Sequence, residues 1–133
     1  MNPIDITSLD DRQLAETVIA LCIEVAEEIG CGHKQAIYEK ALIAAFREAG
    51  LRGDRQVPVQ LVYRGTPVGE FLADIIVEER IIMMVRAVRW LTNEEELQLQ
   101  SILKCSEFRV GLLVNVANPK LEWKGVVDTP GQI

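Results

Sequence analysis

The stretch that decides the fold runs from Phe71 to Val88 and reads FLADIIVEERIIMMVRAV. It contains two apolar segments on either side of the polar residues Glu78-Glu79-Arg80. Each apolar segment is too short for a stable helix and has the composition of a buried strand. The stretch therefore predicts a β-hairpin near the middle of a sheet. One carboxylate, Asp74, lies within its first strand.

The length of the hairpin turn decides which side chains face Asp74. A three-residue turn places Asp74 opposite Met84 and diagonal to Arg86, which share one face because side chains alternate along a strand. A two-residue turn would shift the register by one residue and point both side chains away from Asp74. We predict the three-residue turn and an ion pair between Asp74 and Arg86.

Two helices are expected before the first strand. Asp10 or Asp11 can cap a helix that ends near Ile29, because Gly30 follows. The same apolar periodicity predicts a second helix from Lys34 to Ala49. The positions expected to face the core are Leu14, Val18, Leu21, Cys22, Val25 and Ile29 in the first helix, and Ile37, Ala41, Leu42, Ala45 and Phe46 in the second.

The remaining elements complete an α/β pattern. Arg55 to Tyr63 predicts an edge strand, because it contains a proline that cannot donate to a ladder. Asn93 can cap a helix over Glu94 to Lys104, with Leu99, Ile102 and Leu103 inward. A buried strand is expected from Arg109 to Val116, and a short strand or an extension from Leu121 to Val127. The order predicts a mixed central sheet flanked by helices, with a helical crossover between two parallel strands.

Length, charge and cysteine content limit the classes of protein to which the chain can belong. The 133 residues fit a single domain, with residues 1–10 and 128–133 as ragged tails. The net charge of -6 disfavours a sequence-independent grip on nucleic acid. Three cysteines without a CxxC pair predict neither a disulfide framework nor a zinc site, and favour a cytoplasmic location. The sequence shows no secretory signal and no apolar run that would span a membrane.

Several short motifs occur in a fixed order along most of the chain, from about residue 14 to residue 127. Together they resemble the GxxExxY family of the PD-(D/E)XK nuclease superfamily. The resemblance implies a restriction-endonuclease-like core, in which an Asp, the Glu and Lys of an ExK motif, a helical Glu and a Gln surround a divalent metal such as magnesium. The motifs are Gly32-His33-Lys34-Gln35-Ala36-Ile37-Tyr38-Glu39, Arg55-Gln56-Val57-Pro58, Tyr63-Arg64-Gly65, Ala73-Asp74 and Gly111-Leu112-Leu113-Val114-Asn115.

Carried over position by position, the resemblance implies a degenerate site. The Asp is Asp74, and the Gln of the later helix matches Gln98, a position that suits a solvent-facing residue equally well. The helical Glu is replaced by Gln35, the Glu of ExK by Met84 and its Lys by Arg86. Magnesium prefers oxygen ligands, and a guanidinium does not accept a proton. We therefore expect no bound metal or other cofactor, with Asp74 the only candidate metal ligand.

Three functions fit these residues. The first is a catalytically inactive nuclease-like protein that serves as a binding or scaffolding module. The second is a divergent magnesium-dependent nuclease that cleaves DNA or RNA through a site rebuilt from Asp74 with Glu78, Glu39 or another carboxylate. The third is a homo-oligomeric structural protein. The partner is left open between another protein and a second copy of the chain; nucleic acid is disfavoured by the net charge, and no membrane is expected.

Aromatic side chains outside this set receive simpler interpretations. Trp90 and Trp123 are expected in the core or at an interface, because no basic run surrounds either of them as it would at a base-stacking platform. Tyr38 is expected to be half-buried with its hydroxyl in water, and His33, the only histidine, to be exposed.

Overall fold

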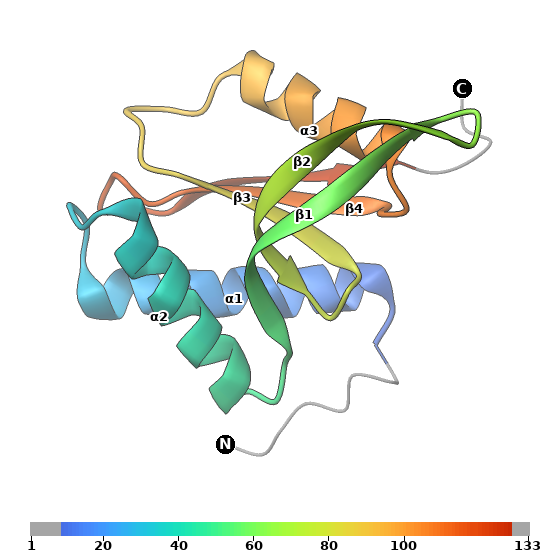
Figure 1. Ribbon diagram of the computed structural model, residues 1–133. Helices are drawn as coiled ribbons and strands as arrows, with labels where there is room; N and C mark the ends of the chain where they lie inside the picture. The colour runs from blue at the N-terminus through green and yellow to red at the C-terminus, as the bar shows by residue number, and fades with distance from the viewer. Residues whose placement is uncertain (1–8, 129–133) are drawn as a thin grey trace.

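Figure 1 shows a computed structural model of the protein, which describes residues 9–128. Three helices and five strands follow one another in the predicted order, with the last segment forming a strand of its own. None of the helices between residues 9 and 128 has the length and apolarity that crossing a bilayer requires. The elements are α1 (Asp11–Ile29), α2 (Gln35–Glu48), β1 (Gly53–Tyr63), β2 (Thr66–Val77), β3 (Ile81–Arg86), α3 (Asn93–Cys105), β4 (Val110–Asn115) and β5 (Glu122–Val127).

The start of α1 is fixed by a capping box. The side chain of Asp10 accepts a hydrogen bond from the amide of Gln13, and the side chain of Gln13 accepts one from the amide of Asp10. At the other end of the chain, the amide of Asp128 donates to the carbonyl of Arg109 at 2.8 Å. Asp10 and Asp128 are thus part of the fold rather than of ragged tails. The rest of the predicted tails lies outside the described residues, apart from Leu9.

The sheet is mixed, as predicted. Its strands lie in the order β1-β2-β3-β4-β5, with β3 in the middle. The pairs β1–β2, β2–β3 and β4–β5 are antiparallel, and β3–β4 is parallel. Helix α3 makes the crossover between β3 and β4, because parallel neighbours cannot be joined by a tight turn.

The hairpin between β2 and β3 has the predicted register. Val77 pairs with Ile81 across the three-residue turn Glu78-Glu79-Arg80, and continuation of this register places Asp74 opposite Met84. Glu78 and Glu79 both have left-handed backbone conformations, with φ of 54° and 55°. The apolar pattern of the two strands therefore outweighs the cost of two non-glycine residues in this region.

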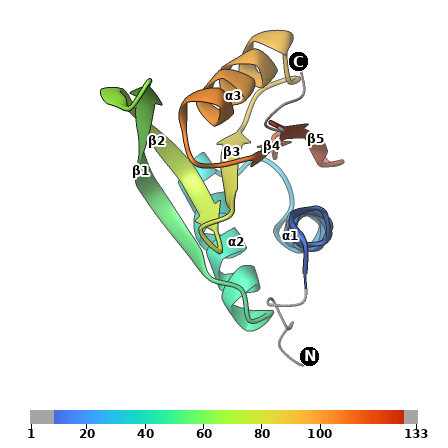
Figure 2. The ribbon, with the colours of Figure 1, turned by 90° about the vertical axis from the view of Figure 1, so that its right-hand side faces the viewer.

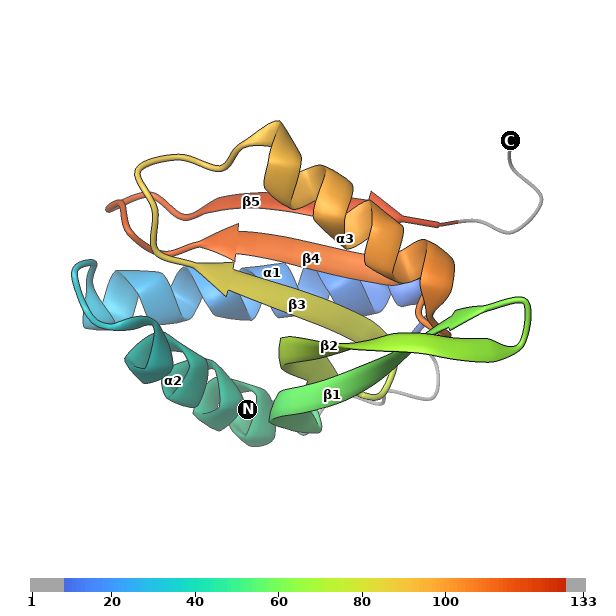
Figure 3. The ribbon, with the colours of Figure 1, turned by 45° about the horizontal axis from the view of Figure 1, so that its top comes forward.

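The helices form two layers around the sheet. Figures 2 and 3 show α1 and α2 on one side and α3 on the other. Each face has its own apolar core, and Leu99, Ile102 and Leu103 of α3 are buried as predicted. The α1/α2 side includes Leu14, Val18, Tyr38, Leu42, Phe46, Ile75, Met83, Val85 and Leu112, whereas the α3 side includes Ala73, Ile76, Ile82, Met84, Leu99, Leu113 and Val126.

Two details of the helices differ from the prediction. In α2, Ile37 was expected to face the core but is 46% exposed, whereas Tyr38 and Glu39 are each 1% exposed. The buried stripe of this helix therefore includes a carboxylate, which an apolar pattern does not reveal. The N-cap of α3 is Thr92 and not Asn93, because Thr92 forms a capping box with Glu95.

Candidate functional site

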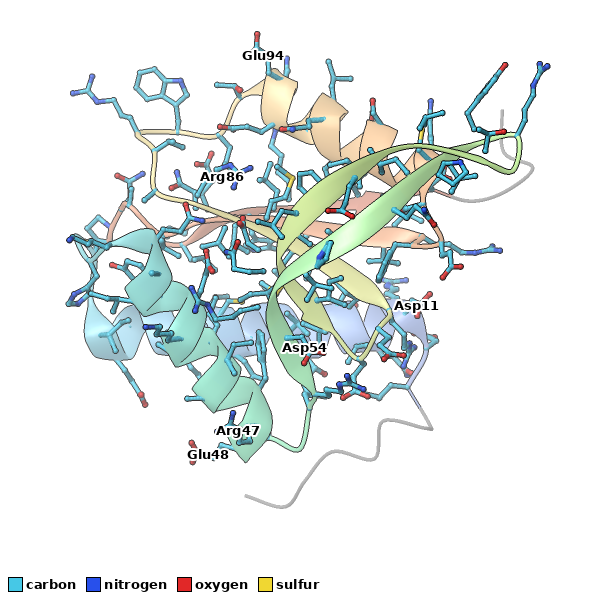
Figure 4. All side chains as sticks on the ribbon, viewed as in Figure 1. Asp11, Arg47, Glu48, Asp54, Arg86 and Glu94 are labelled. Atoms are coloured by element: carbon cyan, nitrogen blue, oxygen red, sulfur yellow. The ribbon has the colours of Figure 1, made fainter. Side chains whose placement is uncertain are left out.

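Asp74 and Arg86 form the predicted ion pair. The Oδ2 atom of Asp74 accepts hydrogen bonds from Nη1 of Arg86 and from the amide of Val85, each at 2.9 Å. The side chains of Asp74 and Arg86 are 14% and 27% exposed, so the pair is partly buried. Figure 4 shows Arg86 between α2 and the loop that leads into α3. The end of β3 thus places a permanent positive charge directly on Asp74.

Burial has the largest effect on the pKa of Asp74. Loss of hydration raises the pKa of this carboxyl above its ordinary value, and the negative charge of Glu39 adds to the increase. The amide of Val85 and the guanidinium of Arg86 lower the pKa, but they do not reverse the effect of burial. The attraction to Arg86 therefore does not fully offset the cost of removing the Asp74 carboxylate from water.

Glu39 is the second carboxylate of the site. Its Oε1 accepts hydrogen bonds from Nε of Arg55 at 3.2 Å and from Nε2 of Gln56 at 3.0 Å, and Nη2 of Arg55 lies 3.1 Å away. Its Oε2 accepts a hydrogen bond from Nε2 of Gln35 at 2.7 Å. We refer to Gln35, Glu39, Arg55, Gln56, Asp74 and Arg86 as the Asp74 cluster.

An irregularity in β1 brings two neighbouring side chains to Glu39. Gln56 has φ of 53°, and it lies opposite Asp74 without pairing, whereas the pairs on either side, Arg55–Ile75 and Val57–Ala73, keep one register. In a regular strand, Arg55 and Gln56 would point to opposite faces. The left-handed residue breaks this alternation, so that both side chains reach the same carboxylate.

The other predicted positions divide between the core and the surface. Gln35 joins the cluster through Glu39, whereas Met84 is fully buried in the core on the α3 side. Gln98 is exposed on α3 and takes no part in the hydrogen bonds of the cluster. Glu78 accepts a hydrogen bond from the amide of Arg52 at the turn end of β2, so it does not combine with Asp74 as one interpretation expected.

Asn115 holds the segment that follows Arg86, a role that sequence reasoning missed. It is completely buried, its Oδ1 accepts from the amide of Val88 at 3.0 Å, and its Nδ2 donates to the carbonyl of Val88 at 2.8 Å. Nδ2 also donates to Glu122, which accepts from the amide of Leu91. The sequence feature that could have predicted this role is an asparagine at the end of an otherwise apolar strand.

One aromatic prediction needs correction. Tyr38 is buried, and its hydroxyl donates to the carbonyl of Gly30 at 2.6 Å and accepts from the amide of His33 at 3.3 Å. Its hydroxyl therefore closes the α1–α2 connection instead of facing water. Trp90 and Trp123 are 60% and 48% exposed, which excludes the core and leaves the interface alternative as a prediction. His33 is exposed as predicted.

The donor set does not fit a magnesium ion. Between residues 9 and 128, no group of three or more His, Cys, Asp or Glu residues is arranged to hold a metal. Magnesium prefers carboxylates and water in an octahedral arrangement. Here Oδ2 of Asp74 and both carboxylate oxygens of Glu39 accept hydrogen bonds from protein donors. Met84 offers a thioether in the position where the resemblance implies a carboxylate.

Comparison with known proteins places the chain in a family. Comparison with curated proteins gives no match. Among solved structures, the chain is similar to an alkaline exonuclease (LHK-Exo) from Laribacter hongkongensis, with 10% identity, a TM-score of 0.41, and 86% of this chain and 82% of that chain covered. The family model of the PD-(D/E)XK nuclease superfamily matches residues 12–126. The chain therefore belongs to the PD-(D/E)XK nuclease superfamily.

Proposed function

We propose that the protein is a catalytically inactive member of this superfamily, of the GxxExxY type, that acts as a binding or scaffolding module. The observation that carries the proposal is the internal pairing of both carboxylates. Asp74 is paired with Arg86, and Glu39 is paired with Arg55. Two negative and two positive charges balance, which leaves no excess negative charge to attract a divalent cation.

The chemistry of hydrolysis supports the same proposal. Phosphodiester cleavage in metal-dependent enzymes needs a metal or a base to generate the attacking hydroxide. Arg86 stands where the resemblance implies a lysine, and its guanidinium stays protonated, so it cannot serve as a base. Met84 is buried in the core and has no oxygen to offer. The polar residues of the cluster instead bind one another, as Asp74 does Arg86 and Glu39 does Gln35 and Arg55.

A second candidate is a nuclease with a rebuilt site at Asp74 and Glu39. The observation in its favour is that the charge of Glu39 acts on Asp74. Magnesium is often held by one or two carboxylates together with water. In this case, Arg55 and Arg86 would have to release the two carboxylates when the metal binds.

A cleavage assay separates the two candidates. Single- and double-stranded DNA and RNA are incubated with the protein and millimolar magnesium or manganese. We expect no turnover above that of Asp74→Ala and Glu39→Gln. Glu48→Gln, an exposed substitution on α2, serves as the matched control. Cleavage that survives in the control and disappears in Asp74→Ala and Glu39→Gln would establish the rebuilt site and reject the inactive module.

Metal binding gives an independent readout through stability. A ligand that binds only the native state adds about 2.7 kcal/mol at a hundredfold excess over its Kd. We expect no magnesium-dependent rise in Tm for the natural chain. The triple substitution Gln35→Glu, Met84→Glu, Arg86→Lys restores the oxygen ligands and should introduce such a rise. A rise in the natural chain that Asp74→Ala removes would contradict the proposal.

The location and assembly of the module stay predictions. Cys22, Cys31 and Cys105 are free, which agrees with the predicted reducing cytoplasm. Self-association is tested by size-exclusion chromatography with light scattering, and a strictly monomeric chain would remove the homo-oligomeric alternative. The net charge of -6 favours a protein partner over nucleic acid.

A further inference from the structure

The outer side of β5 has free backbone groups. Within residues 9–128, β5 lies at the edge of the sheet and has a neighbour only on its β4 side (Figure 3). The amide of Asp128 donates to the carbonyl of Arg109, which fixes the direction of every backbone group along β5. Because these groups alternate along an antiparallel strand, the N–H and C=O groups of Trp123, Gly125 and Val127 point away from β4. Such an edge is a template for another strand.

A hollow lies beside these three residues on the α1 side of the sheet. It has a volume of about 820 Å³ and is bounded by the first turns of α1 and by the outer strands β4 and β5. Trp123 and Val127 are 48% and 66% exposed at its border, and Gly125 between them contributes no side chain. The apolar lining consists mainly of Ala15, Ile19, Val110, Leu112, Trp123 and Val127. We call this region the β5 hollow.

The polar rim of the β5 hollow is mainly acidic. It contains Asp10, Asp11, Glu16 and Asp128 against only two basic residues, Arg12 and Arg109. Arg12 pairs with Glu16 and Asp11 pairs with Arg80, so these charges are largely balanced. Of the other charged rim residues, Asp10 and Asp128 are negative and Arg109 is positive, so the rim keeps a net negative charge. Figure 4 shows Asp11, one of these rim residues, at the beginning of α1.

From the free edge, the hollow and the acidic rim together, we propose that β5 binds an extended segment of a partner protein as an additional strand. The segment would alternate apolar side chains, which enter the β5 hollow, with side chains that face the other side of the sheet. Lysine or arginine residues would flank it and lie near Asp10 and Asp128. This inference goes beyond the proposed function and does not depend on whether the Asp74 cluster is inactive.

The charges argue against a second copy as the occupant. Two chains joined through β5 would bring together two rims that each keep a small net negative charge from Asp10 and Asp128 against Arg109. Like charges that face each other across an interface oppose association. A basic segment would instead gain from the same rim. The free backbone groups favour an extended segment over a helix, because a helix already satisfies its own backbone hydrogen bonds and leaves the edge of β5 unpaired.

A random peptide library displayed on phage tests the composition of the partner. Short peptides are selected on the full chain, and the enriched peptides are synthesised with a fluorescent label. We expect alternating apolar residues with basic flanks. Their affinity, measured by fluorescence polarisation, should fall about tenfold or more in Trp123→Ala and in Val127→Lys. Trp90→Ala and Leu72→Lys, which change equally exposed apolar residues elsewhere, should bind as the natural chain does.

Backbone chemistry tests strand addition separately from side-chain contacts. Methylation of alternate backbone nitrogens in an enriched peptide removes hydrogen-bond donors while it keeps every side chain. We expect one of the two alternating methylation patterns to abolish binding, because only one set of amides faces β5. NMR amide shifts in the natural chain should be largest at Trp123, Gly125 and Val127. These readouts hold even if one of the substituted chains fails to fold.

Several results would overturn the inference. Enrichment of acidic peptides, binding unaffected by either methylation pattern, or shifts centred on another surface would each reject it. Absence of any peptide whose binding depends on Trp123 or Val127 would reject it as well. A dimer in light scattering that Val127→Lys dissociates would identify a second copy as the occupant. Magnesium-dependent cleavage would reject the inactive module but would leave this inference intact.

Discussion

The Asp74 cluster and the β5 hollow differ in how their polar groups are satisfied. In the cluster, on the β1–β3 half of the sheet, two carboxylates accept hydrogen bonds from side chains and backbone of the same chain. At the β5 hollow, the outward-facing backbone groups of an edge strand pair with no other strand of residues 9–128, and an apolar surface lies beside them. Polar residue types alone would point to the cluster as the place where the protein acts. Because these polar groups pair within the chain, we propose that a partner binds at the opposite edge of the sheet.

Burial explains why the cluster needs its internal partners. Every buried side-chain nitrogen and oxygen between residues 9 and 128 has a hydrogen-bond partner. A carboxylate as deeply buried as Glu39 would be very unfavourable without cationic and amide donors. The cluster is therefore a structural unit of the fold. Substitutions there should affect stability, whereas those at the β5 hollow should affect mainly binding.

The largest effect should follow Glu39→Ala. This change leaves Arg55 without its carboxylate and deprives Gln35 and Gln56 of their acceptor. We expect a loss of about 3–5 kcal/mol in the free energy of unfolding, measured by urea denaturation. Glu48→Ala, an exposed substitution on the same helix, should change it by less than about 0.5 kcal/mol. Equal effects of the two substitutions would show that the cluster does not support the fold.

Asp74→Ala should cost less, about 2–3 kcal/mol, because the side chain of Asp74 is 14% exposed, against 2% for Glu39. The amide of Val85 also loses its acceptor. The double substitution Asp74→Ala, Arg86→Met should be less destabilising than the sum of the two single changes, because it removes the stranded charge. The measurement is a double-mutant cycle in urea. Additive effects would mean that the two side chains do not interact energetically.

Two glycines contrast a packed face with an open one. A Cβ atom on Gly111 would lie 2.8 Å from atoms of Leu99 in α3, whereas one on Gly125 would meet its nearest neighbour at 3.8 Å. Gly111→Ala should therefore lower the free energy of unfolding by about 1–2 kcal/mol, through overpacking. Gly125→Ala should change it by less than about 0.5 kcal/mol. Calorimetric Tm values of the two variants provide the test, and the reverse order would contradict the close approach of α3 to β4.

The smallest effect should be a pH dependence caused by Asp74. Its pKa is raised by burial, so the folded state binds this proton more tightly than the unfolded state does. The contribution to stability is fully present below the ordinary Asp pKa of about 3.9 and is lost as pH rises through the higher folded-state value. The free energy of unfolding of the natural chain, relative to Asp74→Asn, should therefore decrease over this window. An increase would show that Arg86 outweighs burial.

Most of the fold could be predicted because its signals are local. The turn at Glu78-Glu79-Arg80 and the apolar strands around it fix the register, and Asp10 and Gly30 delimit α1. The family match to residues 12–126 agrees with the core that the resemblance implies. The restriction-endonuclease-like arrangement of a mixed sheet flanked by helices is thus confirmed.

The candidate site was only half predictable, because its contacts join distant segments. The pair Asp74 and Arg86 lies within one hairpin, so register alone suggested it. Glu39 is buried through donors from β1, and a left-handed residue, Gln56, brings those donors into place. Neither helical periodicity nor strand alternation contains this information. The choice between core and interface for Trp123 was left open for the same reason, because its exposure depends on how distant segments pack.

The parallel pairing of β3 with β4 has a consequence for the order of folding. The β2–β3 hairpin closes over three residues, but β4 meets β3 only after the chain has passed through α3. Distant contacts form more slowly, because closure of a longer loop costs more entropy. We expect the hairpin to be structured in the transition state and β5 to join later. In stopped-flow experiments, Ile76→Val should slow folding, whereas Val126→Ala should mainly speed unfolding.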